Sequence, residues 1–349
     1  MIPSPLRLRL DSAALVANWR LLDKLSGPAA CGAAVKADGY GLGAEQVVAR
    51  LAEAGCRDFF VATWTEAAAL APLGVSVSVL HGVGPDEMPT ALSGMARPVL
   101  NTVQQVARWR EGGGGWCDVM VDTGMNRLGL SVQDIADGVV DGLRIDTLMS
   151  HLACADQDDA MNARQRDALA GLAGQTTARR LSLANSAGIA LGMDYRFDLI
   201  RPGLALYGGV PRTELGGVLP VVTLEARVVQ RRVVPEGETV GYNATWRAER
   251  DTAVAIVNLG YADGYVRRFS GAGAAYFNDV ALPVIGSVSM DLTALDVSAV
   301  GEIAEGDWVT FTFELLSASK IAGLTQYELL TGLGHRFERS WTRSTSQAL

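Results

Sequence analysis

A lysine that ends an apolar run is the residue of this chain best suited to covalent chemistry. Residues 33–35 are apolar, Lys36 follows them, and two glycines within residues 37–41 favour a turn. Burial at a strand end lowers the pKa of a lysine ammonium group, and the free amine can form a Schiff base with a carbonyl compound. A lysine that merely extends into solvent explains the same stretch equally well. The rest of the chain must decide between the two interpretations.

Composition favours small-molecule chemistry over nucleic-acid or membrane binding. The chain has 349 residues, 49% of them hydrophobic, and a formal net charge of −8 at pH 7. Its arginines are scattered, whereas binding to a phosphate backbone requires clustered Lys and Arg. No apolar run reaches the length of a membrane span and no signal-peptide pattern is present, so we expect a cytoplasmic protein. The four cysteines have no paired spacing, which is typical of reduced thiols.

Short apolar runs alternate with helical stretches over the first two hundred residues. The runs end near Lys36, Ala62, His81, Asn101, Asp122, His151, Leu183 and Arg201. Strands that alternate with helices pair in parallel, so these units predict a closed (β/α)8 barrel of the TIM type over residues 11–217. No Gly-x-Gly-x-x-Gly follows the first strand to indicate a dinucleotide-binding fold.

The pattern changes after residue 217. Stretches rich in Val, Thr, Ile and Phe, separated by Pro and Gly turns, occupy residues 219–234, 252–259, 280–285, 292–297 and 307–313. They predict an all-β C-terminal domain over residues 218–349, and the alternating residues 7–10 predict that residues 1–10 add a strand to it. The expected fold class is therefore α/β followed by all-β.

Polar residues gather where the predicted barrel strands end. They are Lys36, residues 122–127, His151, Asn185, Ser186, Arg201 and Gly203. Chemistry in a (β/α)8 barrel lies at these ends, and phosphate commonly binds after the seventh and eighth strands. Each residue alone has an ordinary structural explanation, such as a core histidine or a helix cap. Together an amine, a flat histidine, an arginine and a cradle of hydroxyl and amide groups are what pyridoxal phosphate requires. A metal site is disfavoured, because His151, Cys154 and Asp156 fit no standard ligand spacing.

The chain resembles the alanine racemase family over nearly its whole length. The matching stretches are residues 34–41, 121–129, 150–156, 184–187, 201–208, 240–242, 260–264 and 289–291. Any one of them is a weak match, but their shared order and spacing are specific. The resemblance implies a pyridoxal phosphate-dependent isomerase that interconverts L- and D-alanine and supplies D-alanine for peptidoglycan.

The resemblance also implies roles for individual residues. Lys36 would bind the cofactor as a Schiff base and act as one of two acid/base groups that flank the substrate Cα. Tyr242 would be the second, assisted through His151 by Arg201; taken alone it fits a packed β-domain tyrosine better, and the motif context reverses that interpretation. Arg201 would keep the cofactor ring nitrogen unprotonated. The other implied cofactor contacts are Tyr40, Asn185, Ser186, Gly203, Leu204 and His335.

Substrate contacts and assembly follow from the same resemblance. Arg127 would bind near the substrate carboxylate, and Tyr261 would narrow the entrance. Tyr242, Met290 and Asp291 would reach the barrel of a partner subunit. The expected assembly is therefore a homodimer with shared active sites.

Three departures from the family pattern leave alternatives open. His335 stands where the family has a phosphate-contacting tyrosine, Ser182 replaces a common histidine, and Met120 replaces a lysine that positions Arg127 in many members. His335 favours a serine or broad-specificity amino-acid racemase as the enzymatic alternative. A pyridoxal phosphate decarboxylase shares the architecture, but its cysteine-aspartate region is not evident. A cofactor-binding regulatory protein is the non-enzymatic alternative, although such proteins generally lack the β domain.

Overall fold

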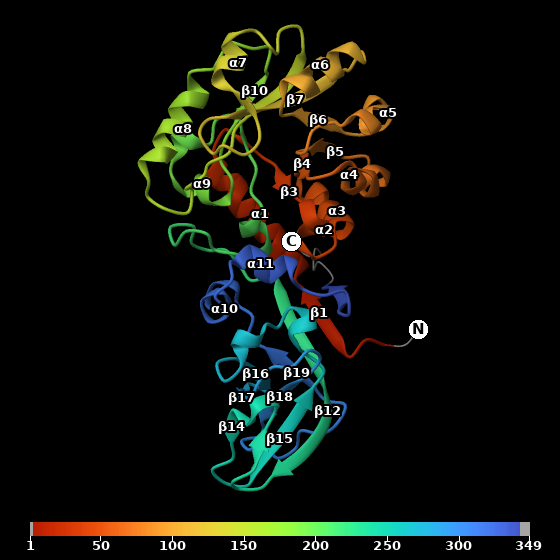
Figure 1. The fold of residues 1–349 in the computed structure, drawn as a ribbon, viewed down its shortest axis with the longest axis vertical. Coiled ribbons are helices and arrows are strands. Elements are labelled where there is room, and N and C mark those ends of the chain that lie inside the picture. The colour runs from red at the N-terminus through yellow and green to blue at the C-terminus, as the bar shows by residue number, and fades with distance from the viewer. Residues whose placement is uncertain (1–2, 343–349) are drawn as a thin grey trace, which may run out of the picture. The chain divides into compact units, whose positions relative to one another are not determined.

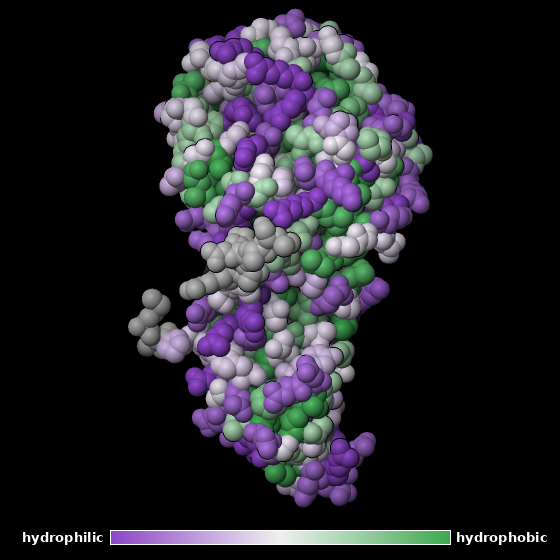
Figure 2. Space-filling view, turned by 180° about the vertical axis from the view of Figure 1, so that it is seen from behind, coloured by the Kyte–Doolittle hydropathy of each residue, from purple (hydrophilic) through white to green (hydrophobic). Residues whose placement is uncertain are grey.

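The computed structural model describes residues 3–342, which fall into two compact units (Figure 1). The barrel domain comprises Leu15–Leu219, and the β domain comprises the residues up to Ala14 together with those from Pro220 onward. None of the helices within residues 3–342 has both the length and the apolar composition to cross a lipid bilayer. On the face drawn in Figure 2, hydrophilic side chains are spread over the surface and hydrophobic ones form small groups between them.

Parallel strands in the barrel domain close into a ring. In ring order they are β2 (Ala30–Cys31) with β3 (Ala33–Ala34), β4 (Asp58–Val61), β5 (Ser76–Val79), β6 (Arg97–Leu100), β7 (Trp116–Asp122), β9 (Arg144–Met149), β10 (Arg180–Ser182) and β11 (Leu199–Ile200). The first barrel strand is split at Gly32, so that β2 pairs with β11 and β3 pairs with β4. A Cβ at Gly32 would lie 2.9 Å from the Asp58 carbonyl oxygen, so glycine permits this closure. The predicted barrel is confirmed.

Helices connect successive strands, and side-chain caps fix where several of them begin. Helix α1 (Ser12–Ser26) precedes the first barrel strand. The others are α3 (Ala44–Ala54), α4 (Trp64–Leu70), α5 (Met88–Leu92), α6 (Val103–Glu111), α7 (Val132–Ala136), α8 (Ala160–Ala170) and α9 (Ser186–Ala190). Thr63 and Glu66 form a capping box at the start of α4, and Thr102 caps α6. Both caps directly follow barrel strands, so they fix the backbone at the end of the barrel where chemistry is expected.

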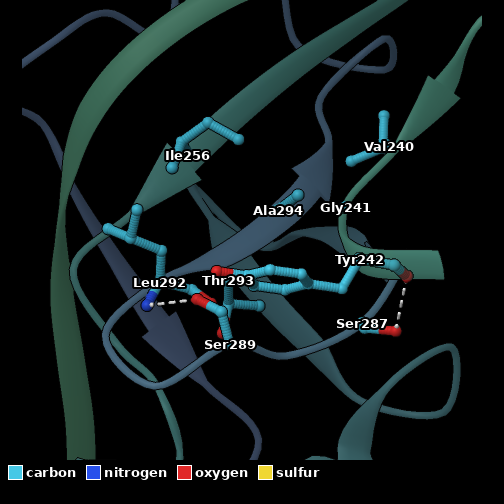
Figure 3. A pocket seen from close by; sticks show the side chains of 9 residues that line it. All are labelled: Val240, Gly241, Tyr242, Ile256, Ser287, Ser289, Leu292, Thr293 and Ala294. Carbon is cyan, nitrogen blue, oxygen red and sulfur yellow. Dashed lines mark hydrogen bonds between the residues drawn. The ribbon is translucent and has the colours of Figure 1, made fainter. Parts of the chain in front are cut away.

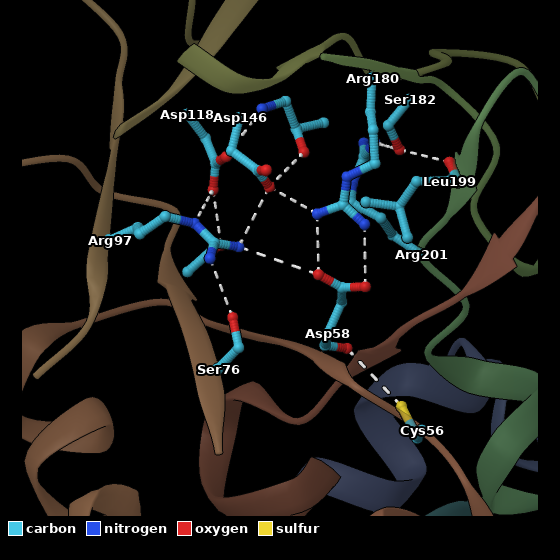
Figure 4. Close-up of polar contacts among 12 residues, drawn as sticks. Cys56, Asp58, Ser76, Arg97, Asp118, Asp146, Arg180, Ser182, Leu199 and Arg201 are labelled. Carbon is cyan, nitrogen blue, oxygen red and sulfur yellow. Dashed lines mark hydrogen bonds and ion pairs between the residues drawn. The ribbon is translucent and has the colours of Figure 1, made fainter. Parts of the chain in front are cut away.

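Charged side chains cluster inside the barrel toward the end at which its strands begin (Figure 4). They are Asp58, Arg97, Asp118, Asp146 and Arg180. Arg180 donates hydrogen bonds of 2.9 and 2.8 Å to the two carboxylate oxygens of Asp58 and one of 2.5 Å to Asp146. Burial raises the pKa of Asp118, and the Arg97 charge opposes this effect. Because this end of a (β/α)8 barrel serves stability, we assign the cluster a structural role.

A long antiparallel strand organises the β domain. β12 (Val222–Val234) pairs in its first part with β1 (Leu6–Leu10) and β19 (Trp308–Phe311), and in its second part with β15 (Thr252–Val257). A register shift between Val228 and Gln230 marks the change of partner. The remaining strands are β13 (Thr239–Val240), β14 (Trp246–Arg247), β16 (Ala274–Phe277), β17 (Val280–Ile285), β18 (Thr293–Asp296) and β20 (Glu338–Trp341). The predicted C-terminal strand domain is present.

Two short helices in the β domain are not predicted by the apolar pattern. They are α10 (Leu315–Ala322) and α11 (Gln326–Thr331). The Glu314 carboxylate caps α10, and Thr325 forms a capping box with Glu328 at the start of α11. Helices this short do not display enough turns for hydrophobic periodicity to separate them from strands.

Candidate active site

The stretch after the first barrel strand forms a left-handed turn, labelled α2 (Lys36–Tyr40). The successive residues with positive φ are Ala37 (53°), Asp38 (53°), Gly39 (63°) and Tyr40 (57°). An L-residue in this conformation costs about 1–2 kcal/mol, from which glycine is largely exempt. The Asp38 carboxylate helps to hold the turn, because it accepts a hydrogen bond from the Ala44 N–H at 2.8 Å. Backbone strain of this kind clusters at functional sites.

Lys36 lies at the C-terminal end of the first barrel strand with an exposed side chain. Desolvation by the surrounding protein nevertheless lowers the pKa of its ammonium group, and the Arg127 charge acts in the same direction. Glu66 opposes both effects. Its carboxylate accepts hydrogen bonds of 2.7 Å from the N–H groups of Ala37 and Ala62, which ties the ends of two strands together. Glu66 is not among the residues predicted for the site, although its capping-box spacing is visible in the sequence.

Buried hydroxyl and N–H groups meet beyond the last two barrel strands. The Ser186 hydroxyl accepts hydrogen bonds from the N–H groups of Gly203 at 3.0 Å and Ala205 at 3.1 Å. Tyr40 is buried and stacks on Tyr207, with ring centroids 4.6 Å apart. A Cβ at Gly203 would lie 2.1 Å from the Tyr40 hydroxyl oxygen, so any larger residue must displace a packed ring. We call this arrangement of Tyr40, Ser186 and Gly203 the cradle.

Two further predicted residues flank the cradle. Asn185 caps α9, and its side-chain amide oxygen accepts a hydrogen bond from the Gly188 N–H at 2.9 Å. Leu204 is buried and begins the short turn that follows Gly203. The residues predicted for phosphate binding in the barrel domain therefore surround one cradle.

We expect Gly203→Ala to weaken cofactor binding about 10-fold or more. The new methyl group would push the Tyr40 ring off Tyr207, and overpacking of this kind costs about 1–3 kcal/mol. The measurement is a titration of the protein with pyridoxal phosphate, followed by absorbance. Gly115→Ala is the matched control, because a Cβ at Gly115 meets no atom within 4 Å. Equal affinities for the two variants would contradict the assignment of the cradle.

Arg201 is buried at the end of the last barrel strand, and its hydrogen-bond acceptors are neutral. Its guanidinium donates to the Ser182 hydroxyl and, at 2.6 Å, to the Ser150 carbonyl oxygen. The Ser182 hydroxyl donates in turn to the Leu199 carbonyl oxygen, so this chain of hydrogen bonds ends on the backbone (Figure 4). Burial lowers the pKa of Arg201 to about 10, and Asp118 opposes this effect. The guanidinium therefore stays cationic at neutral pH.

The His151 ring is electrostatically coupled to the cationic groups of the barrel. Desolvation lowers its pKa to about 3. The charges of Arg201, Arg127 and Lys36 act in the same direction. The ring is therefore neutral at physiological pH. Within the described part of the chain no residue forms a hydrogen bond with the ring, whereas the His151 carbonyl oxygen accepts one of 2.8 Å from Gln165.

The lowered pKa of His151 predicts how stability depends on pH. An unfolded histidine takes up a proton below about pH 6.5, whereas folded His151 stays neutral down to about pH 3. The unfolded state therefore binds more protons in this interval, so the contribution of His151 is complete above pH 6.5 and is lost as the pH falls. The slope is at most about 1.4 kcal/mol per pH unit. Urea unfolding between pH 7 and pH 5 measures it, and we expect a smaller loss of stability in His151→Asn. Parallel profiles for the two proteins would refute the prediction.

Arg127 has no carboxylate partner among the described residues. Its backbone is fixed, because the Asp122 carboxylate accepts the N–H groups of Gly124 at 2.8 Å and of Arg127 at 2.9 Å. Burial alone would raise the pKa of Asp122, but such backbone hydrogen bonds outweigh it and lower the pKa. Met120 packs in an apolar cluster with Phe60 and offers no group to the guanidinium. The Arg127 side chain is therefore available to an anionic ligand.

Tyr242 lines an open pocket of about 390 Å³ within the β domain (Figure 3). Its side chain is 67% exposed, and the ring extends toward Leu292 and Thr293. The Ser287 hydroxyl donates a hydrogen bond of 3.3 Å to the Tyr242 carbonyl oxygen, which fixes the backbone and leaves the ring at the surface. Within the described residues the phenol hydroxyl has no hydrogen-bond partner. Any group that assists this phenol in proton transfer must therefore come from outside its pocket.

Arg336 ties together loops of the β domain that carry four of the predicted site residues. Those residues are Tyr261, Met290, Asp291 and His335, and all are exposed. The Arg336 guanidinium donates hydrogen bonds of 2.6 and 2.8 Å to the buried carboxylate of Asp263, and one of 2.7 Å to Asp291. The Ala262 N–H donates to the Met290 carbonyl oxygen at 3.0 Å. Arg336 is not a predicted site residue, because its role depends on pairing with residues distant in the sequence.

The predicted site residues fall into two groups, one in each domain. The barrel domain holds Lys36, Tyr40, Arg127, His151, Asn185, Ser186, Arg201, Gly203 and Leu204, and the β domain holds Tyr242, Tyr261, Met290, Asp291 and His335. Within residues 3–342 no three His, Cys, Asp or Glu side chains are grouped so as to hold a metal ion. The barrel group combines cations, a neutral imidazole and neutral hydrogen-bond donors, which suits an anionic cofactor.

Comparison with known proteins identifies the family. Residues 10–211 match the model of the alanine racemase N-terminal domain, and residues 221–341 match that of the C-terminal domain. Alanine racemase from Acidiphilium cryptum is 41% identical, with 95% of this chain and 97% of that protein aligned. Proteins of Agrobacterium fabrum described as catabolic and biosynthetic alanine racemases are 41% and 40% identical, over 96% and 97% of this chain and 91% and 94% of theirs.

Solved structures agree with the sequence comparison. The crystal structure of alanine racemase from Bartonella henselae, with covalently bound pyridoxal phosphate, has a TM-score of 0.88 and 34% identity, covering 97% of this chain and 100% of that one. The biosynthetic alanine racemase from Pseudomonas aeruginosa has a TM-score of 0.87 and 30% identity, covering 98% and 100%. This chain belongs to the alanine racemase family of enzymes.

Proposed function

We propose that the protein interconverts L- and D-alanine with pyridoxal phosphate, using Lys36 and Tyr242 as acid/base groups on opposite faces of the substrate. Near-complete alignment with alanine racemases supports the reaction and the cofactor. One observation carries the assignment of residues. Lys36, whose pKa is lowered, and the neutral His151 ring both follow the C-terminal ends of barrel strands, as the residues of the cradle do.

The residues of the barrel fit the cofactor. The cradle offers the Ser186 and Tyr40 hydroxyls and leaves no room for a Cβ at Gly203, as expected where backbone closely approaches a phosphate. Lys36 is the amine that would hold the cofactor covalently, and Arg201 is the cation that would face its ring nitrogen. When bound, the cofactor supplies a conjugated ring that takes up the electron pair left on the substrate Cα.

Lys36 serves as the acid/base group on one face of the substrate. Its amine would accept or donate the Cα proton on that face. The lowered pKa increases the share of neutral amine at physiological pH, which a general base requires. Arg127 holds the substrate carboxylate, because its guanidinium has no carboxylate partner among the described residues.

Tyr242 serves as the acid/base group on the other face. A phenol with a pKa near 10 requires assistance to act as a base at neutral pH. The neutral His151 ring has a free nitrogen lone pair that can accept a hydrogen bond from the phenol. Arg201 stays cationic and discourages protonation of both the histidine and the ring nitrogen. Proton transfer through such positioned groups contributes about 10²–10⁴-fold to rate.

We further propose that the protein acts as a homodimer with shared sites. Tyr242, Tyr261 and Met290 are exposed apolar side chains of the β domain, and such side chains often mark an interface. In this assembly the β domain of one subunit delivers Tyr242 to the barrel of its partner. The D-alanine produced would supply peptidoglycan synthesis.

The substrate is tested by racemisation assays of the holoenzyme on alanine, serine, lysine and arginine. We expect alanine to be the preferred substrate. His335 in place of a tyrosine favours serine or a broader range as the second candidate, because it changes a wall of the substrate pocket. A clear preference for a larger amino acid would overturn the alanine assignment, and absence of racemisation with bound cofactor would overturn the enzymatic one.

A further inference from the structure

Two buried side-chain amides of helix α8 form hydrogen bonds with His151 and the loop that follows it. Asn162 and Gln165 are 2% and 0% exposed. Burying an amide without hydrogen bonds is costly, so its partners show what the side chain holds in place. Asn162 donates to the carbonyl oxygens of Cys154 and Gln157, both at 3.0 Å, and so anchors the far part of the loop.

Gln165 anchors the near part of the loop, at the residue of the site itself. Its amide nitrogen donates to the His151 carbonyl oxygen at 2.8 Å and to the Thr123 hydroxyl at 3.3 Å. Its amide oxygen accepts the Ala153 N–H at 2.9 Å. One buried side chain therefore joins the ends of two neighbouring barrel strands, β7 and β9.

The connection continues to the buried arginine. The hydroxyls of Thr123 and Ser150 form a hydrogen bond of 2.7 Å, and the Ser150 carbonyl oxygen accepts one of 2.6 Å from Arg201. Ser150 directly precedes His151, so the backbone that carries the imidazole is held from both sides. The ring has no hydrogen-bond partner within the described residues, so its position depends on these backbone anchors and on packing.

We propose that Gln165 is a positioning residue for the second acid/base group: it fixes the His151 ring in the place where it can assist the phenol. This inference rests on the proposed function of Tyr242. Gln165 acts through its hydrogen bonds to the His151 carbonyl oxygen, the Ala153 N–H and the Thr123 hydroxyl. A displacement of about 1 Å in such a group can cost on the order of 10²-fold in rate.

The test compares Gln165→Met with the matched control Asn162→Leu in the holoenzyme. Both changes remove hydrogen bonds from the same helix to the same loop, but only the first releases His151. We expect kcat to fall about 10-fold or more in Gln165→Met with a small change in KM. Because His151 assists one face only, the primary isotope effect should rise with one α-deuterated enantiomer of alanine and fall with the other. A uniformly loosened site would change both in the same direction.

A second readout does not depend on activity. The chain has three histidines, so the His151 signal of isotopically labelled protein can be assigned by substitution. We expect this signal to move in Gln165→Met and to stay in place in Asn162→Leu. If Gln165→Met does not fold, Thr123→Val takes its place, because it breaks the hydrogen bond to Ser150. We expect its two isotope effects and its His151 signal to change in the same directions as those predicted for Gln165→Met. Identical isotope effects and an unmoved signal would overturn the positioning role. A wild-type protein that does not racemise alanine would instead overturn the proposed function.

Discussion

Lys36→Ala is expected to lose racemase activity by about four orders of magnitude or more. The substitution removes the amine that would hold the cofactor and, with it, the acid/base group on one face of the substrate. General acid/base catalysis alone contributes about 10²–10⁴-fold, and loss of cofactor attachment adds to this. The measurement combines racemisation kinetics with the absorption band of the attached cofactor, which borohydride bleaches in the wild-type protein.

Lys24→Ala is the control for Lys36→Ala. Lys24 is exposed in the last turn of α1, which precedes the first barrel strand, whereas Lys36 follows that strand, so the loss of Lys24 should leave band and rate unchanged. Unfolding in urea shows whether Lys36→Ala is folded. A folded Lys36→Ala protein that keeps both the band and the racemisation would contradict the assignment of Lys36.

Tyr242→Phe is expected to lower kcat by about 10²–10⁴-fold while the cofactor stays bound. The substitution keeps the ring that lines the pocket and removes only the hydroxyl. Since that hydroxyl has no hydrogen-bond partner among the described residues, folding should not suffer. Cofactor absorbance should match the wild type, because the residues assigned to the cofactor lie mainly in the barrel domain.

Mixing the two inactive proteins tests whether the sites are shared. In a dimer of one Lys36→Ala and one Tyr242→Phe subunit, one of the two shared sites has both acid/base groups intact. We therefore expect partial recovery of activity after subunit exchange, up to about a quarter of wild type if exchange is random. This figure follows from half of the dimers being mixed and each holding one intact site. No recovery after demonstrated exchange would exclude a site built from two subunits.

The barrel and most of its strand ends are predictable from the sequence because short apolar runs alternate with helical stretches and most of these runs end near a polar residue. Lys36, His151 and Arg201 all mark such ends, and the structure has β3, β9 and β11 ending next to them. Their chemistry follows from residue type, since burial shifts the pKa of a lysine or histidine in a known direction. The lowered pKa of Lys36 agrees with that expectation, although its side chain is more exposed than a buried strand end suggests.

Other parts of the site depend on contacts between distant residues. The left-handed conformation from Ala37 to Tyr40 is not predictable, because only one of its residues is glycine and local preference opposes the rest. The links from Gln165 to the His151 carbonyl oxygen and from Arg336 to the Asp263 carboxylate join residues whose spacing in the sequence has no characteristic pattern. Such hydrogen bonds form only after the strands have brought their partners together.

Hydrogen exchange at the substrate Cα tests the central claim most directly. The holoenzyme is incubated with L-alanine in D₂O, and the amounts and deuterium content of both enantiomers are followed with time. We predict equal final amounts of L- and D-alanine, with deuterium at Cα in each D-alanine molecule formed early in the reaction, because one face loses the proton and the other receives one from solvent-exchanged groups. Early D-alanine that retains the original hydrogen would contradict proton transfer by two groups, and unchanged L-alanine would contradict racemisation itself.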